Sequence, residues 1–457
     1  MSKNTPQKNN LLKNIPKIDK ILEHSSFEGL SLKVLLPILR EEINSLRENI
    51  LNEKCVEIDE NFLISSIIKK YHDVMTPTLQ KVINATGVIV HTNLGRSLIN
   101  PKSFDNAKEV ATSYNTLEFD MQKGKRGERY SHLSKIFTKL LDCEDVLVVN
   151  NNASAVFLIL NTFAKQKEVI VSRGELVEIG GSFRIPEVMS NSGANLVEVG
   201  ATNKTHLRDY ENNINEETKM LMKVHKSNYT IEGFTAEVEF SDIAKLAKEK
   251  NIIDYYDLGS GHLVDLPYGL SNTEPSLKEI MKDEPSLLSF SGDKLFGSVQ
   301  AGIIVGKKEL IAKLKKNQLL RMLRVDKLTL SILTEDIKSY LLNEQHNIPT
   351  LNMLFKDVDE LKVNAKTLVD DITDIVKCEI IETTTLIGGG STPNKKIPSI
   401  AVTIQIKEYS ASKLQNMFRK KNIIGRIEDD TFILDFRTIQ INDISYIKES
   451  IECLATL

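Results

Sequence analysis

The sequence has few cysteines, and they form no recognisable metal or redox motif. The four cysteines lie far apart, without a CxxC pair or a histidine–cysteine cluster at metal-ligand spacing; they are Cys55, Cys143, Cys378 and Cys453. Such usage is typical of a protein kept in a reducing cytosol, and it argues against a structural zinc site. We therefore expect no bound metal.

The sequence also lacks long apolar stretches and a strong charge of either sign. Its polar start, MSKNTPQKNN, carries no hydrophobic signal segment, and no run reaches the length needed to cross a membrane. The formal net charge of −3 gives no general attraction to nucleic acid, so any RNA contact must be local. These absences predict a cytoplasmic protein without a membrane partner.

What is present is an ordinary globular composition spread over a long chain. At 457 residues the chain exceeds what one hydrophobic core usually supports, so we expect more than one domain. The patterns predict a helical N-terminal domain over residues 1–78 and a large α/β domain over residues 79–335. A smaller α+β domain is expected over residues 336–457.

The N-terminal region shows apolar residues at helical spacing but no net charge. Its first twenty residues carry five lysines against Asp19 alone, whereas residues 1–75 hold 11 basic and 11 acidic side chains. Charge alone therefore leaves open whether this domain binds RNA or is a solvated helical cap.

From Leu141 onward, short apolar runs alternate with helical stretches, which predicts a mostly parallel sheet. Four polar clusters follow predicted strands: Asn150–Asn152, His225–Asn228, Asp257–Gly261 and Ser291–Lys294. Ligands of such sheets bind at the carboxyl ends of the strands. We therefore expect the four clusters to converge on one crevice.

Lys294 stands in a small polar turn between two short apolar strands. A lysine that loses its solvation has a lowered pKa and becomes a usable nucleophile. The chemistry this suggests is a Schiff base with a carbonyl cofactor, most often pyridoxal phosphate. The alternative is a strand-end lysine whose ammonium group reaches water.

The other clusters supply what a pyridoxal site needs besides the lysine. Asp257 suits the ring nitrogen, because a facing carboxylate favours the protonated ring. The helix start Asn151-Asn152-Ala153 suits the phosphate, and the Ser291 hydroxyl can add to it. His225 or Asn228 can reach the ring oxygen.

Long motifs carry a resemblance that is far more specific than the short SGDK around Lys294. The chain resembles bacterial selenocysteine synthase, also called L-seryl-tRNA(Sec) selenium transferase, nearly from end to end. The motifs that carry the resemblance are INATGVIVHTNLGR (83–96), VVNNNASAV (148–156), VSRGELVEIGGSFRIPEVM (171–189), VEVGATNKTHLRDY (197–210), KVHKSNYTIEGF (223–234), DLGSGHLVDL (257–266) and SFSGDKLFGSVQAGIIVGKKELI (289–311).

The resemblance implies a fold-type I pyridoxal-phosphate transferase with Lys294 as the aldimine lysine. It implies seryl-tRNA(Sec) as the substrate, selenophosphate as the selenium donor and a homodecamer built as a pentamer of dimers. It also suggests that the N-terminal domain binds the tRNA.

The implied reaction replaces the serine hydroxyl with selenium while the amino acid stays on the tRNA. Lys294, once freed from the cofactor, is the natural general base at Cα, and Asp257 stabilises the protonated ring. Loss of water gives an aminoacrylyl-tRNA, to which the selenium nucleophile adds. The leaving hydroxyl needs a proton donor, and the sequence leaves Asp293 and a nearby histidine open.

The selenium donor is an anion, so the site needs fixed cations. Arg96 follows the first strand of this region, and Arg321 and Arg324 are three residues apart, which predicts a shared helix face. These arginines are our candidates, in line with the family pattern, because guanidinium groups suit tetrahedral oxyanions. The alternative for each is an ordinary salt bridge between subunits.

Two other functions share parts of this pattern. A β-eliminating lyase acting on a free amino acid would use Lys294 and Asp257 but would not need the N-terminal domain. A tRNA-binding assembly protein without catalysis would need the N-terminal domain but would have little reason to keep a buried lysine.

Overall fold

The computed structural model describes residues 5–52, 54, 57–176, 178–179 and 183–456. Its contacts divide the chain into two units, Met1–Lys81 and Val82–Leu457. Three of the cysteines are free thiols, and Cys55 lies outside the described residues. Within the described ranges, no helix is long and apolar enough to cross a membrane, and no group of metal-ligating side chains is found.

The first unit is helical, as its periodicity predicts. It contains α1 (Thr5–Lys13), α2 (Ile18–Leu22), α3 (Leu32–Leu51) and α4 (Glu60–Met75). The apolar residues of α3 and α4 recur every three or four positions, so each helix has one apolar face. These faces share one core, whose buried members include Leu35, Leu39, Ile43, Leu63, Ile67 and Tyr71.

A seven-stranded sheet forms the centre of the second unit. Its strands, in spatial order, are β4 (Asp145–Val149), β12 (Gly302–Gly306), β11 (Leu287–Ser291), β10 (Ile253–Gly259), β9 (Thr218–Val224), β5 (Glu168–Ser172) and β8 (Asn195–Val199). Only β12 runs antiparallel to its neighbours β4 and β11. The prediction of a mostly parallel α/β sheet is confirmed.

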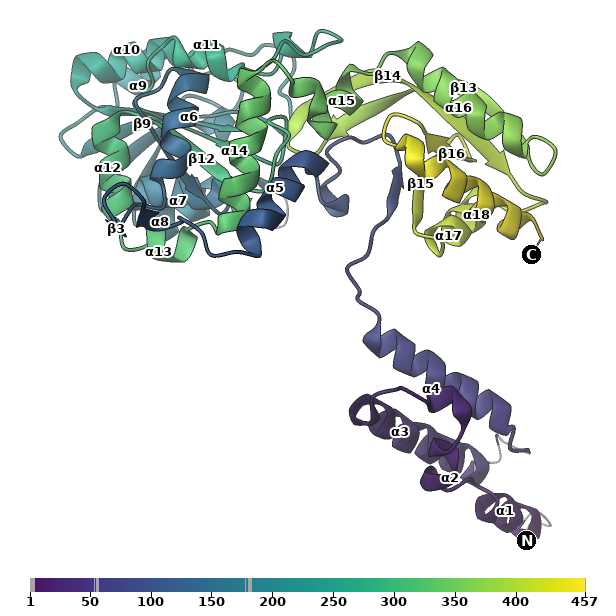
Figure 1. Cartoon of the computed structure of the whole chain (residues 1–457). Coiled ribbons are helices and arrows are strands. Elements are labelled where there is room, and N and C mark those ends of the chain that lie inside the picture. Colours follow the sequence, from purple (N-terminus) through teal and green to yellow (C-terminus); the bar gives the residue numbers. More distant parts are fainter. Residues whose placement is uncertain (1–4, 53, 55–56, 177, 180–182, 457) are drawn as a thin grey trace. The chain divides into compact units, whose positions relative to one another are not determined.

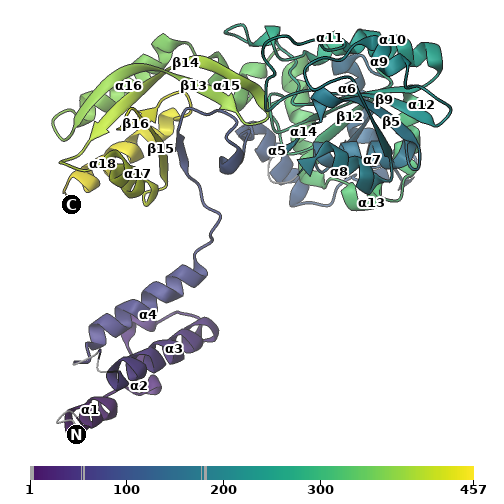
Figure 2. The ribbon, with the colours of Figure 1, turned by 180° about the vertical axis from the view of Figure 1, so that it is seen from behind.

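Helices cover both faces of this sheet (Figure 1, Figure 2). Side chains of a strand alternate between its faces, and β4 shows this: Val146 and Val148 join one core cluster, while Leu147 and Val149 join the other. The first cluster takes in α6 (Ser131–Leu141), α10 (Phe240–Lys250) and α14 (Lys327–Leu341). The second takes in α7 (Asn152–Phe163), α8 (Ile185–Ser192) and α12 (Lys308–Lys316).

A second sheet of five strands is built mainly from the C-terminal part of the chain, drawn in green and yellow in Figure 1. Its order is β1 (Ile83–Ala85), β15 (Ile423–Glu428), β16 (Thr431–Asp435), β14 (Ser391–Gln405) and β13 (Lys377–Gly388). The helices that share its core are α16 (Val358–Ile372), α17 (Ala411–Arg419) and α18 (Ile444–Thr456). Strand β1 therefore joins this sheet, although its residues fall in the range that we assigned to the large domain.

Candidate active site

The predicted polar clusters meet at one edge of the large sheet. Strands β9, β10 and β11 are parallel, and β4 runs the same way because the antiparallel β12 separates it from β11. Asn152, after β4, donates its side-chain amide to Asp257 Oδ1 at 2.7 Å. The backbone N–H of His225, after β9, donates to the carbonyl of Asp257 at 2.9 Å. The expected convergence is confirmed, while the chemical role of each residue stays a prediction.

Asp257 is a buried carboxylate, with only 3% of its surface exposed. Its Oδ1 accepts from Asn152, from the backbone N–H of Gly259 at 3.2 Å and from the Ser289 hydroxyl at 3.5 Å. Burial raises the pKa of Asp257, and the Asn152 hydrogen bond and the charge of Lys294 oppose that rise. None of the described residues donates to Oδ2, so this oxygen can take a donor from a ligand.

Lys294 lies in the turn after β11 and is only 4% exposed, which excludes an ammonium group that reaches water. Burial is the main cause that lowers the pKa of Lys294, and the charge of Arg96 lowers it further. The carboxylates of Asp257, Asp293 and Glu274 oppose this shift. The side chain is therefore poised toward the neutral amine, the form that a nucleophile or base needs.

Asp293 and Arg96 form an ion pair beside this lysine. Arg96 NH1 lies 3.0 Å from Asp293 Oδ2, and the carboxylate is nearly buried. The backbone N–H of Ser97 also donates to the Asp293 carbonyl at 3.3 Å. The loop that carries Arg96 is thus fixed to the Lys294 turn, as a cation of this site requires.

The helix start at Asn151 has the geometry of an anion cradle. Asn151 caps α7, and its side-chain oxygen accepts from the N–H of Ser154 at 2.8 Å. Asn152 and Ala153 occupy the first turn, whose N–H groups point out of the helix end. Ser291 ends strand β11, two strands away from β4 in the sheet, and is buried.

The structure distinguishes the two residues predicted for the ring oxygen. His225 is mostly buried, and its Nε2 lies 3.2 Å from Glu274 Oε2. Asn228 is exposed, and its side chain donates to the Glu178 carbonyl at 2.8 Å. Within the described part of the chain, no contact joins Asn228 to Asp257 or Lys294, so the geometry favours His225.

The prediction that Arg321 and Arg324 share a helix face is wrong. Helix α13 (Leu320–Leu323) ends before Arg324, whose backbone is extended, with φ −70° and ψ 143°. The chain leaves the helix because Arg324 forms a β-bridge with Val149. Both arginine side chains are exposed, and Arg324 lies 3.8 Å from Glu118. The bridge nevertheless places this segment beside the carboxyl end of β4.

Sequence reasoning missed two parts of the site. One is Glu274, which no motif marked. The other is the turn between β13 and β14, residues Gly388 to Thr392, which reaches Lys294 from the other sheet: a Cβ added to Gly390 would lie 2.9 Å from Lys294 Nζ. The glycine triplet of this turn was the available signal.

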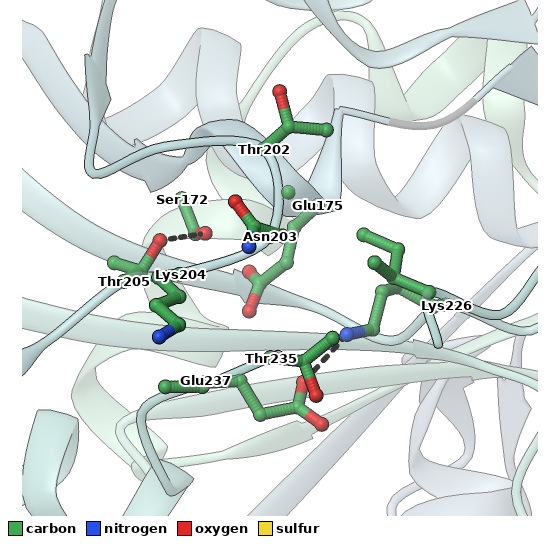
Figure 3. A pocket seen from close by; sticks show the side chains of 12 residues that line it. Ser172, Glu175, Thr202, Asn203, Lys204, Thr205, Lys226, Thr235 and Glu237 are labelled. Atoms are coloured by element: carbon green, nitrogen blue, oxygen red, sulfur yellow. Dashed lines mark hydrogen bonds and ion pairs between the residues drawn. The ribbon is translucent and has the colours of Figure 1, made fainter. Parts of the chain in front are cut away.

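A separate small pocket lies beyond the carboxyl end of β5 and is lined by Ser172, Thr205, Lys226 and Glu237, among others (Figure 3). Its cavity of about 60 Å³ has room for about two water molecules, far less than a cofactor needs. Figure 3 shows Lys226 and Glu237 facing each other, with an ion pair of 2.9 Å. This pocket holds none of the predicted site residues.

The comparisons with known proteins define the class of the chain. A solved structure titled D-glucosaminate-6-phosphate ammonia-lyase matches with a TM-score of 0.59 at 19% identity, and covers 84% of this chain and 99% of that one. This likeness concerns the fold alone, which is that of the fold-type I pyridoxal-phosphate enzymes.

Sequence comparison places the chain in a particular family. The family model of L-seryl-tRNA selenium transferase matches residues 82–440. A relative from Sulfurimonas denitrificans is 63% identical over 98% of this chain and its own full length, and one from Aliarcobacter butzleri is 60% identical over 97% and 98%. Both are named L-seryl-tRNA(Sec) selenium transferase. The chain belongs to the L-seryl-tRNA selenium transferase family.

Proposed function

We propose that the chain converts seryl-tRNA(Sec) to selenocysteinyl-tRNA(Sec) in the cytoplasm, with selenophosphate as the donor and pyridoxal phosphate bound at Lys294. The observation that carries the proposal is the buried pair of Lys294 and Asp257 at the carboxyl edge of the sheet, in a chain of this family.

The donor set fits pyridoxal phosphate. Asn152 Oδ1 is buried and finds no hydrogen-bond partner within the described chain, which is costly unless a ligand supplies one. Asp257 has an oxygen left for a ring N–H, and the start of α7 offers N–H groups to a phosphate. When bound, the cofactor would supply an electron sink for proton removal at Cα.

The chain's own residues then handle the protons. Burial lowers the pKa of Lys294, which favours the neutral amine that would take the Cα proton. With the cofactor bound, Asp257 would accept a hydrogen bond from the ring nitrogen and keep it protonated, and His225 would serve the ring oxygen. Asp293 and His225 are the candidates to protonate the leaving hydroxyl.

Three arginines are assigned to the selenium donor. Arg96 is held beside Lys294 by its ion pair with Asp293. Arg321 and Arg324 flank the end of β4 on an exposed segment. Guanidinium groups at these two places can bind the oxygens of selenophosphate.

The same proposal assigns the remaining parts of the chain. The helical unit Met1–Lys81 binds the tRNA, and the chain assembles as a homodecamer, a pentamer of dimers. Both assignments rest on the resemblance described in the sequence analysis, and a tRNA substrate is consistent with a cytoplasmic location.

A spectroscopic titration tests the function. The purified protein, loaded with pyridoxal phosphate, is mixed with seryl-tRNA(Sec) or with free serine while the cofactor absorbance is recorded. A change with the tRNA alone supports the proposal. A change with free serine alone indicates the amino-acid lyase, and a protein that takes up no cofactor indicates the binding protein; either result overturns the proposal.

A further inference from the structure

The turn from Gly388 to Thr392 packs directly on the candidate catalytic lysine. Gly390 has a φ of +82°, and a Cβ at this position would lie 2.9 Å from Lys294 Nζ, so the lysine side chain would have to shift. Thr392 has a φ of +48°, a conformation that is strained for a β-branched residue. Such strain persists only where neighbouring contacts hold it, and it is common at functional sites.

Glu274 provides the main contact that holds this turn. Its side chain is 1% exposed and lies near Lys294, whose charge it influences. Its Oε1 accepts the backbone N–H of Thr392 at 2.5 Å. Its Oε2 lies 3.2 Å from Nε2 of His225. One buried carboxylate therefore joins the turn of the second sheet to the end of β9 in the first.

A second contact joins the same two regions. The hydroxyl of Ser391 lies 2.8 Å from that of Ser260, in the loop after β10. Both serines are buried. Ser391 is thus held by the loop after β10, and Thr392 is held by Glu274, which also contacts the residue after β9.

Of the two contacts that hold the turn, the one from Glu274 should contribute more to its stability than the one from Ser260. A buried carboxylate is costly unless donors satisfy it, and hydrogen bonds to a charged acceptor are about twice as strong as neutral ones. Removing the acceptor would leave the Thr392 N–H buried without a partner, and it would release the His225 ring.

We propose that Glu274 is a positioning residue that holds the Gly388–Thr392 turn against Lys294 and orients the His225 imidazole beside Asp257. The effect of Glu274 on catalysis rests on the proposed function. The role of Glu274 in holding the turn does not depend on that function.

The carboxylate also selects which nitrogen of His225 carries a proton. A carboxylate only accepts, so Nε2 must be the protonated nitrogen in this contact. A glutamine at position 274 can still accept from Thr392 with its oxygen, but its NH₂ group then faces Nε2. Glu274→Gln therefore keeps the turn in place and disturbs His225, whereas Glu274→Ala removes both contacts.

Hydrogen exchange of the cofactor-free, full-length protein tests the turn. We expect the amides of the peptide that covers residues 388–392 to exchange about tenfold faster or more in Glu274→Ala. In Glu274→Gln they should exchange as in the native protein. The matched control is Glu279→Ala, which removes an exposed glutamate whose ion pair with Lys282 lies within the same short segment; it should leave the turn unchanged.

Steady-state kinetics of the loaded enzyme test the His225 contact. Glu274→Gln should lower kcat about tenfold while KM for seryl-tRNA(Sec) stays within about twofold, because only the orientation of a proton-transfer group changes. A general loss of folding would not give this separation while the turn stays protected.

Three results overturn the inference: native exchange in Glu274→Ala, loss of protection in Glu274→Gln, or native kcat in Glu274→Gln. If Glu274→Ala does not fold, Glu274→Gln still tests the contact with Thr392 by exchange and the contact with His225 by kcat. Exchange is measured without cofactor or tRNA, so a failure of the proposed function would not alter that result.

Discussion

At the scale of single residues, burial lowers the pKa of Lys294 at the edge of the sheet where Asp257 lies. Lys294→Ala should remove the absorbance band of bound pyridoxal phosphate, because Lys294 is the lysine whose charge acts on Asp257. Activity should fall by about a thousandfold or more. Lys308→Ala, at an exposed lysine on α12, is the control and should keep the band. A band that survives in purified Lys294→Ala would contradict the assignment.

Gly390 tests how closely the turn must approach this lysine. Gly390→Ala places a methyl group 2.9 Å from Lys294 Nζ at a φ of +82°, so we expect weaker cofactor binding. The control is Gly29→Ala, where φ is +76° but nothing lies within 4 Å of the added carbon. Both variants strain the backbone by about 1 kcal/mol, but only Gly390→Ala crowds the lysine. Equal cofactor affinity in the two variants, measured by absorbance titration, would refute this role of the turn.

The residues of the site were predictable where the chain order itself carries the signal. Asp257 lies near the carboxyl end of its strand, and His225 and Lys294 follow theirs, so the rule for parallel sheets brings them together without any coordinates. Glu274 follows no strand, and its partner Thr392 lies in another sheet. Contacts between distant loops depend on how two sheets dock, which a local pattern does not contain.

At the scale of elements, the position of a strand in the sequence was easier to predict than the strand with which it pairs. Strands β5 and β8 are two of the short apolar runs that alternate with helical stretches after Leu141. The segment after Thr76 gave no sign that β1 would pair with β15, because pairing partners so far apart leave no local trace. The prediction that Arg324 shares a helix face with Arg321 is wrong for a similar reason. The β-bridge of Arg324 to Val149 gives this residue an extended backbone, which the helical spacing did not indicate.

An element-scale prediction concerns the junction of α5 (Pro101–Ala111) with α14. Asp336 on α14 is fully buried and accepts hydrogen bonds from Ser103 on α5 at 2.6 Å and from Ser298 at 2.5 Å. Burial raises the pKa of Asp336 from 3.8 to about 6. The folded state therefore holds the proton more tightly than the unfolded state does. This stabilisation is fully present below pH 3.8 and is lost as pH rises through about 6.

The pH dependence of unfolding checks this junction. Between these limits, the native protein should lose up to about 3 kcal/mol relative to Asp336→Asn, which cannot ionise. Denaturant unfolding of both proteins at pH 5 and pH 7.5, at one protein concentration, measures the part of this loss that falls above pH 5, about 1.4 kcal/mol. Parallel pH profiles for the two proteins would show that Asp336 keeps an ordinary pKa.

At the scale of the whole molecule, the two units have separate cores, so the proposed cofactor binding and the proposed tRNA binding can be tested separately. The core of the first unit draws only on residues of Met1–Lys81, and every predicted cofactor residue lies in Val82–Leu457. The catalytic unit should therefore fold without the helical unit, because it loses none of its own buried contacts.

Deletion of residues 1–75 tests this division of labour. The shortened chain should bind pyridoxal phosphate with native affinity and spectrum, while its affinity for seryl-tRNA(Sec) falls by about tenfold or more, as expected when several contacts to phosphate are lost. Filter binding at one fixed salt concentration measures the affinity, and the cofactor spectrum verifies folding. The loss should be smaller at high salt, because the electrostatic share of binding is then screened in both proteins. Native tRNA affinity in a shortened chain with a native spectrum would assign tRNA binding to the catalytic unit instead.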